Sequence, residues 1–168
     1  MTETSKKVSR RTFIAGTVGG LAVGALAGYA GGGLLARQTE TSNEGVVRKI
    51  FEGSTDVQYT DDFAYLAMGI GTLDKEAMDK LYGTLFETFP DVSFWINRMI
   101  SQGNTVVVEY TLSATHNKDW AGIPATGKKF EYIGVEIYDF EAGKVKLLKS
   151  FGPLMMMATL RSLSGTSA

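Results

Sequence analysis

The sequence predicts an α+β fold, in which a curved antiparallel sheet of about four strands packs on N-terminal helices. Three observations lead to this prediction. Apolar residues recur at helical spacing in the first part of the folded region, strand-like segments fill the second part, and short turn signals separate the segments. Helices and strands that are segregated along the chain, rather than alternating, are typical of this class.

The helical part contains two amphipathic segments. The first helix follows a candidate cap, Ser42 or Asn43, and carries an apolar stripe within residues 46–51. The second and clearer helix begins after Asp74, another candidate cap. It ends at Pro90, because proline cannot continue a helix.

Extended segments make up most of the remaining chain. A short one is expected over residues 61–66. Longer ones are expected over residues 92–100, 105–115, 130–140 and 145–151. Turn signals at Gly103-Asn104 and Ala142-Gly143 join them pairwise into hairpins, and a loop lies at residues 117–127. Residues 154–163 are expected to form a short helix or an apolar cap.

Composition and charge exclude several kinds of function. The 168 residues include no cysteine and a single histidine, His116, so cysteine-based and histidine-rich metal sites are excluded. Residues 1–36 hold four of the 17 basic residues and one of the 18 acidic residues, which leaves the remainder with a net charge of −4. This acidic balance argues against a nucleic-acid partner. No phosphate loop or dinucleotide fingerprint is present, and no cofactor is expected.

The first residues resemble a twin-arginine translocation signal. Arg10, Arg11 and Phe13 stand in a Ser-Arg-Arg-x-Phe-Ile pattern, and residues 12–36 carry no charge. This resemblance implies export by the twin-arginine translocase to the periplasm or the extracellular face of the cytoplasmic membrane. The uncharged run holds eight glycines, which favours cleavage near residues 25–27 over retention as a membrane anchor, although both remain open.

These segments divide the chain into four predicted parts. Residues 1–36 form the signal or anchor, and residues 37–45 form a polar linker or the frayed start of a helix. Residues 46–163 form a single folded domain, which is long enough to bury a core of its own, and residues 164–168 form a tail.

Four short motifs in the folded region occur in a recognisable order. They are Phe89-Pro90-Asp91-Val92, His116 at the end of a strand, Gly122-Ile123-Pro124-Ala125-Thr126-Gly127-Lys128, and Gly134-x-x-Ile137-Tyr138-x-Phe140-Glu141-x-Gly143-Lys144-Val145. Together they resemble the SnoaL-like polyketide cyclases, or ester cyclases, over roughly residues 60–160. The resemblance implies the nuclear-transport-factor-2-like fold, a cystatin-like α+β cone with an apolar pocket between its sheet and helices. The same fold hosts cyclases, isomerases and non-catalytic binding subunits.

Three positions depart from the family pattern. The last strand of the family carries a tryptophan followed by the proton-shuttling aspartate, whereas this sequence has Lys149 and Pro153 at those positions. An early histidine of the family is replaced by Leu66. The resemblance therefore implies the pocket and leaves open whether the protein is an enzyme.

A turn at Ala142-Gly143 would fix the register of the last hairpin. Strict alternation from this turn places Glu136 opposite Lys149, on a face shared with Tyr138 and Phe151. The family's tryptophan and aspartate lie on this face, so the resemblance points it into the pocket. Glu136 is then a candidate general base and Lys149 its electrostatic partner. A solvated surface pair and a structural pair in a closed core are the alternatives.

His116 is a further candidate for acid–base work, because imidazole titrates near neutral pH. The alternative is that His116 ties down the following loop. The wall of the pocket is expected to be formed by aromatic and thioether side chains, namely Tyr65, Met68, Trp120, Tyr132, Tyr138 and Phe151.

Three functions remain open from the sequence. The first is an exported cyclase- or isomerase-type enzyme that moves a proton next to a carbonyl in a small hydrophobic substrate. The second is a non-catalytic extracytoplasmic protein that binds a hydrophobic small molecule. The third is an assembly module, such as a homodimer formed through the sheet.

Overall fold

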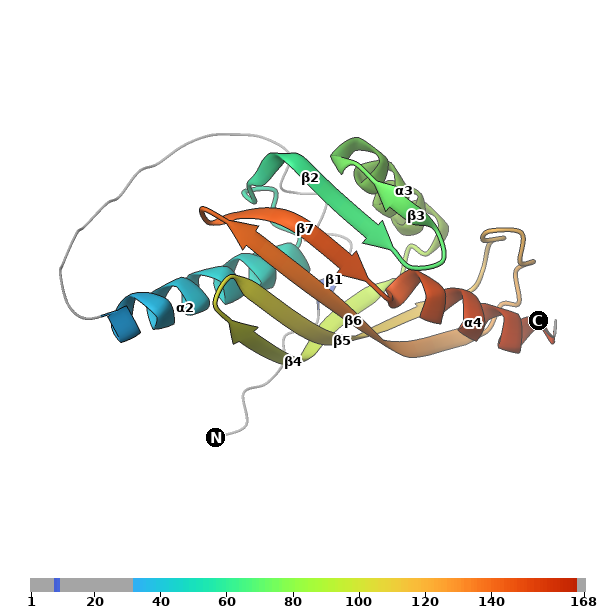
Figure 1. The fold of residues 1–168 in the computed structure, drawn as a ribbon. Coiled ribbons are helices and arrows are strands. Elements are labelled where there is room, and N and C mark those ends of the chain that lie inside the picture. Colours follow the sequence, from blue (N-terminus) through green and yellow to red (C-terminus); the bar gives the residue numbers. More distant parts are fainter. Residues whose placement is uncertain (1–7, 10–31, 166–168) are drawn as a thin grey trace.

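The computed structural model describes residues 8–9 and 32–165 of the chain, with side chains from residue 42 onward (Figure 1). The elements, in chain order, are β1 (Val8–Ser9), α2 (Gly32–Phe51), β2 (Tyr59–Ala67), β3 (Gly71–Leu73), α3 (Lys75–Thr88), β4 (Ser93–Gln102), β5 (Thr105–Thr115), β6 (Lys129–Glu141), β7 (Lys144–Ser150) and α4 (Gly152–Ser164). Residues Arg10, Arg11 and Phe13 of the predicted export signal lie outside the described residues.

The predicted α+β class is confirmed, because the helices pack on one curved sheet that does not close into a barrel (Figure 1). The prediction of about four antiparallel strands was wrong. Within the described residues the sheet has seven strands in the order β1-β4-β5-β6-β7-β2-β3. It is mixed, because β2 pairs with β7 in parallel. A parallel pairing between strands far apart in the sequence leaves no turn signal by which it could be predicted.

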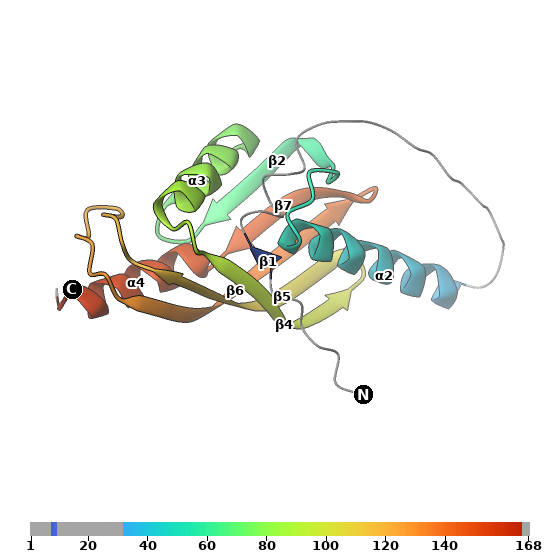
Figure 2. The same ribbon diagram turned by 180° about the vertical axis from the view of Figure 1, so that it is seen from behind.

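The helices α2, α3 and α4 all pack against side chains of one face of the curved sheet, the face that carries Tyr110 and Tyr138. Figure 2 shows α2 and α3 on the near side of the sheet. The core on this face forms two buried clusters. One joins α4 and the C-terminal end of α3 to β5 and β6, and the other joins α2 and the start of α3 to β2 and the last hairpin. On the opposite face, Ile133 is 55% exposed. The cavity described below lies on the helix-covered face.

The helix α2 begins earlier than predicted. Residues 37–45, expected to be a linker or a frayed helix start, belong to the helix, and Ser42 and Asn43 lie inside it rather than at its cap. Asn43 is buried, and Glu44 accepts a hydrogen bond from the Ser101 hydroxyl of β4. This contact with the sheet holds a polar stretch that has little apolar periodicity of its own in a helix. No helix of the described part is long and apolar enough to cross a membrane.

The boundaries of α3 follow the predicted signals. The Asp74 side chain caps the first turn, accepting a hydrogen bond from the Ala77 backbone N–H at 2.8 Å. The helix ends at Thr88, directly before the cap residue Phe89 and Pro90. This helix carries Met78, which is buried, and Tyr82 along one face.

The last hairpin has a register that differs from the predicted one. Ala142 and Gly143 both have positive φ, as a two-residue turn requires, and Glu141 pairs with Lys144 as expected. A β-bulge then adds one residue to β7, so that Glu136 faces Ser150 and Lys149 faces Ile137. Alternation could not decide this register, because Leu147 and Leu148 are both apolar and either can point inward.

Candidate functional site

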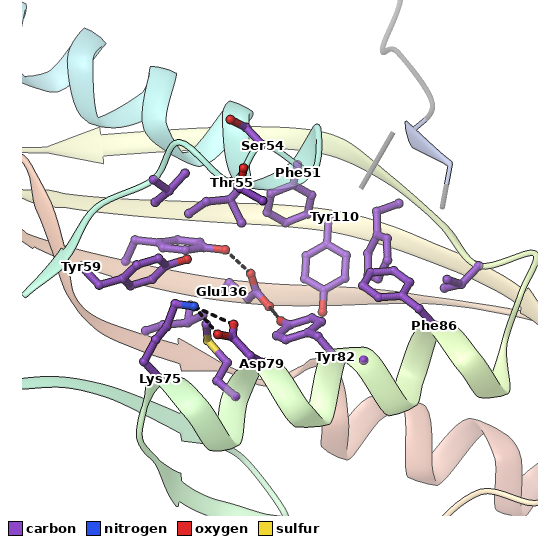
Figure 3. A pocket seen from close by; sticks show the side chains of 18 of the residues that line it. Phe51, Ser54, Thr55, Tyr59, Lys75, Asp79, Tyr82, Phe86, Tyr110 and Glu136 are labelled. Atoms are coloured by element: carbon purple, nitrogen blue, oxygen red, sulfur yellow. Dashed lines mark hydrogen bonds and ion pairs between the residues drawn. The ribbon is translucent and has the colours of Figure 1, made fainter. Parts of the chain in front are cut away.

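A cavity of about 600 Å³ lies between the sheet and the helices α2 and α3 (Figure 3). Its entrance side is marked by exposed residues of α3 and of the loop after α2, among them Thr55, Asp79 and Glu87. Its wall combines aliphatic side chains with seven aromatic ones, namely Phe51, Tyr59, Tyr82, Phe86, Phe94, Tyr110 and Tyr138. A cavity of this size and lining suits a small-molecule ligand.

Glu136 of β6 is the acidic side chain at the inner end of this cavity, and Figure 3 shows it among the rings of the wall. It is only 4% exposed, and its carboxylate accepts three hydrogen bonds. The Tyr138 hydroxyl donates at 2.5 Å, the Ser150 hydroxyl at 3.0 Å and the Tyr82 hydroxyl at 3.3 Å. None of the ion pairs within the described residues involves Glu136.

The protonation behaviour of Glu136 follows from these surroundings. Burial raises the pKa of the Glu136 carboxyl, because the low-dielectric interior disfavours its charged form. The three hydroxyl donors partly oppose this effect, because their hydrogen bonds stabilise the anion. A carboxylate with a raised pKa is a stronger base than an exposed one, which suits proton abstraction.

The hydrogen bonds extend from Glu136 to further tyrosines behind the cavity wall. Tyr65 is hydrogen-bonded to Ser150 and Tyr82. Tyr110 is hydrogen-bonded to Ser150 and to Tyr132. Burial raises the pKa of Tyr65 to about 12, so its phenol keeps its proton and remains a donor at neutral pH. The result is a connected network of protonated hydroxyls around one carboxylate.

Two glycines leave the space that Tyr110 occupies in this network. A Cβ atom on Gly152, the first residue of α4, would overlap the Tyr110 hydroxyl oxygen. A Cβ atom on Gly134 of β6 would overlap the Tyr110 ring at Cζ. The absence of a side chain at these positions therefore lets the end of the Tyr110 side chain fit between Gly134 of β6 and Gly152 of α4.

The predicted partnership of Glu136 with Lys149 was wrong. The bulge in β7 turns Lys149 to the other face of the sheet, where its Nζ lies 3.3 Å from the Asp139 carboxylate. Both side chains are about one-third exposed, at 38% and 34%. Ser150 takes the place opposite Glu136 and supplies a neutral donor instead of a cation.

Of the six predicted wall residues, only Tyr138 lines the cavity. Tyr65 and Tyr132 are buried behind the wall and join the hydroxyl network. Met68 is 41% exposed and Phe151 is 38% exposed, so neither contributes to the wall. Trp120 packs against Phe89 in the loop region, with ring centroids 5.3 Å apart.

Several wall residues were missed by the sequence analysis. Met78, Tyr82 and Phe86 are spaced four residues apart on α3, a stripe that could have indicated a pocket-facing side. Phe51 carried no such signal, because its place depends on how α2 packs on the sheet.

His116 does not lie in the cavity. It is fully buried beside Phe89, its Nδ1 lies 3.3 Å from the Thr126 hydroxyl, and its backbone carbonyl accepts hydrogen bonds from the N–H groups of Thr126 and Gly127. Burial lowers the pKa of His116. These contacts match the alternative in which His116 ties down the loop. Within the described residues, no group of three or more acidic or histidine side chains is arranged to hold a metal ion.

Comparisons with family models and with solved structures lead to the same protein family. The family model of the SnoaL-like polyketide cyclases matches residues 58–156. Among solved structures, a protein from Jannaschia sp. CCS1 described as a SnoaL-like polyketide cyclase is 20% identical and has a TM-score of 0.64, with 73% of this chain and 93% of that chain covered. No curated protein matches the sequence.

Two Streptomyces proteins are similar in fold. AclR from Streptomyces galilaeus, described as a hydroxylase, is 19% identical with a TM-score of 0.62, covering 79% of this chain and 99% of that chain. TsrD from Streptomyces laurentii is 19% identical with a TM-score of 0.56, covering 80% and 94%. At this level of identity the likeness is one of fold.

Proposed function

Because the chain belongs to the SnoaL-like polyketide cyclase family, we propose that its cavity binds a small, largely apolar carbonyl compound and that Glu136 transfers a proton at the carbon next to the carbonyl. The observation that carries this proposal is the position of Glu136, a buried carboxylate that lines an aromatic cavity and has no cationic partner among the ion pairs of the described residues. The aspartate that performs acid–base work in the family has no counterpart at Pro153, so Glu136 takes over the role from a different strand.

In the proposed reaction, Glu136 acts as the base and a hydroxyl group of the cavity wall stabilises the negative charge that develops on the carbonyl oxygen. The Glu136 carboxylate accepts the proton from the carbon, and the electron pair moves onto the carbonyl oxygen to give an enolate. Tyr110 also lines the cavity, so its hydroxyl is the candidate donor to the developing oxyanion. Return of the proton from Glu136 to another carbon completes an isomerisation. Ring closure instead forms a bond from the enolate carbon to a second carbonyl carbon of the substrate, and Glu136 returns its proton to the alkoxide oxygen that results.

Hydrogen–deuterium exchange tests this proposal. Small aryl ketones in D2O are followed by NMR, and the wild-type protein is expected to exchange the hydrogens next to the carbonyl. Glu136→Gln is expected to slow this exchange by about 10²–10⁴-fold, the usual contribution of a positioned base. Asp139→Asn, on the outer face, serves as the matched control and is expected to leave the rate unchanged. Equal rates for wild type and Glu136→Gln would overturn the assignment.

Non-catalytic binding is the second candidate function, and the observation that favours it is Pro153 in place of the family's aspartate. In that case aryl ketones bind in the cavity without exchange above the buffer rate. Titration of the same ketones by NMR, monitoring the protein, separates the two functions, because binding is expected under both and exchange only under the first.

We also propose that the protein is exported by the twin-arginine route, which rests on Arg10, Arg11 and Phe13 in the sequence. Replacing both arginines by lysine is expected to leave the protein inside the cell. Fractionation of cells that express the two forms measures this difference. Accumulation of the double variant outside the cytoplasm at the wild-type level would contradict the proposal.

A further inference from the structure

The cavity has the features of a site for organic cations, which goes beyond the proton transfer proposed above. We infer that it binds ligands with a positively charged nitrogen, such as a protonated amine, on an apolar body, and that Glu136 is the counter-ion. Three independent features of the described residues support this ligand class: the hydrogen bonding of Glu136, the aromatic wall and the charge balance of the lining.

The first feature is the buried Glu136 carboxylate, which is hydrogen-bonded to hydroxyl groups but paired with no positively charged side chain among the ion pairs of the described residues. All three side chains bonded to Glu136 are hydroxyls, which donate to the carboxylate and carry no charge of their own. Hydroxyl donors stabilise the anion but do not neutralise it. A buried charge without a partner is costly, so a ligand that supplies the missing positive charge gains the energy of that pairing.

The second feature is the electron-rich wall. Seven aromatic side chains line the cavity, and aromatic faces attract cations through their quadrupole. The protein already uses one of these rings in this way, since Lys75 Nζ lies 4.8 Å from the centroid of the Tyr59 ring (Figure 3). An ammonium group that reaches Glu136 would pass between rings of the same kind.

The third feature is an excess of negative charge. The charged residues of the lining are Lys75, Asp79, Glu87 and Glu136. Lys75 is paired at 2.6 Å with both carboxylate oxygens of Asp79, as Figure 3 shows, so its charge is already balanced. Glu87 is exposed and has the Lys118 ammonium 2.9 Å from its backbone carbonyl, so Glu136 at the inner end is the unbalanced charge of the lining, and its field favours a cation over an anionic ligand.

Calorimetric titration of the full chain with two matched probes tests this inference. The probes are 4-phenylbutylamine, which is protonated at pH 7, and 4-phenylbutanol, which has the same size and no charge. The wild type is expected to bind the amine at least about tenfold more tightly than the alcohol, a preference of about 1.4 kcal/mol. Glu136→Gln is expected to remove this preference, so that the variant binds the amine and the alcohol about equally.

Asp139→Asn is the control, because it removes a carboxylate from the outer face, and it is expected to keep the preference for the amine. Equal binding of amine and alcohol by the wild type, or a preference that survives in Glu136→Gln, would overturn the inference. The hydrogen–deuterium exchange assay uses uncharged ketones. If the protein shows no preference for the amine, the rate of exchange measured with those ketones is therefore unaffected. Conversely, a protein that prefers the amine but exchanges no hydrogen would retain the cation site and lose the proposed chemistry.

Discussion

Gly152→Ala is expected to lower the free energy of unfolding by about 3 kcal/mol, because its methyl group would overlap the Tyr110 hydroxyl. The phenol cannot move away easily. It lies on β5, which pairs with β4 and β6, and its hydroxyl is bonded within the network around Glu136. Urea denaturation at neutral pH measures the change. Gly45→Ala on α2 is the control, because no atom lies within 4 Å of its added methyl group, and it is expected to be neutral or stabilising.

Removing the hydroxyl separates this clash from other causes. In a Tyr110→Phe background, Gly152→Ala is expected to cost much less, because the closest contact of the new methyl group is the hydroxyl oxygen. Gly134→Ala is expected to keep its cost in the same background, because its methyl group overlaps the ring itself at Cζ and Cε1. An equal cost of Gly152→Ala in both backgrounds would show that the Tyr110 hydroxyl is not what the glycine accommodates.

The stability of wild type relative to Glu136→Gln is expected to fall as the pH rises. Burial raises the pKa of Glu136 above its ordinary value of 4.5, so the folded protein holds this proton more tightly than the unfolded chain does. Stability therefore decreases as the pH rises from about 4.5 through the raised pKa of the folded state, by about 1.4 kcal/mol for each unit of the shift. Glutamine stays neutral at every pH and has no such dependence.

Urea denaturation of both proteins at several pH values between 5 and 9 measures this difference. His116 contributes an opposite trend, since burial lowers its pKa and its protonation below pH 6.5 destabilises the folded state. This contribution is the same in both proteins and cancels when their free energies of unfolding are subtracted. A difference that stays constant across this range would contradict a raised pKa for Glu136.

The site depends on a register that the local sequence does not determine. The turn at Ala142-Gly143 was predicted, and alternation from it placed Glu136 on one face with Tyr138, which the family resemblance pointed into a pocket; both residues line the cavity. The residue predicted to lie opposite Glu136 was wrong by one position, because a single extra residue in β7 places Ser150 there and moves Lys149 to the opposite face. The chemical consequence is large, since Glu136 loses a neighbouring cation and gains hydroxyl donors.

The sequence by itself determined the features that depend on local chemistry. Periodicity predicted α3 with its Asp74 cap, and the hairpin turns predicted the long strands of the sheet. These features arise from interactions between residues close in the chain, which a linear pattern records.

Only the tertiary structure decided how distant segments meet. The parallel pairing of β2 with β7, the packing of a polar α2 on β4, and the space for Tyr110 between Gly134 and Gly152 all join residues far apart in the sequence. Their energies come from burial and contact between side chains that no local pattern relates. The cavity is formed where these long-range contacts meet, so of the aromatic and thioether residues predicted for its wall only Tyr138 lines it.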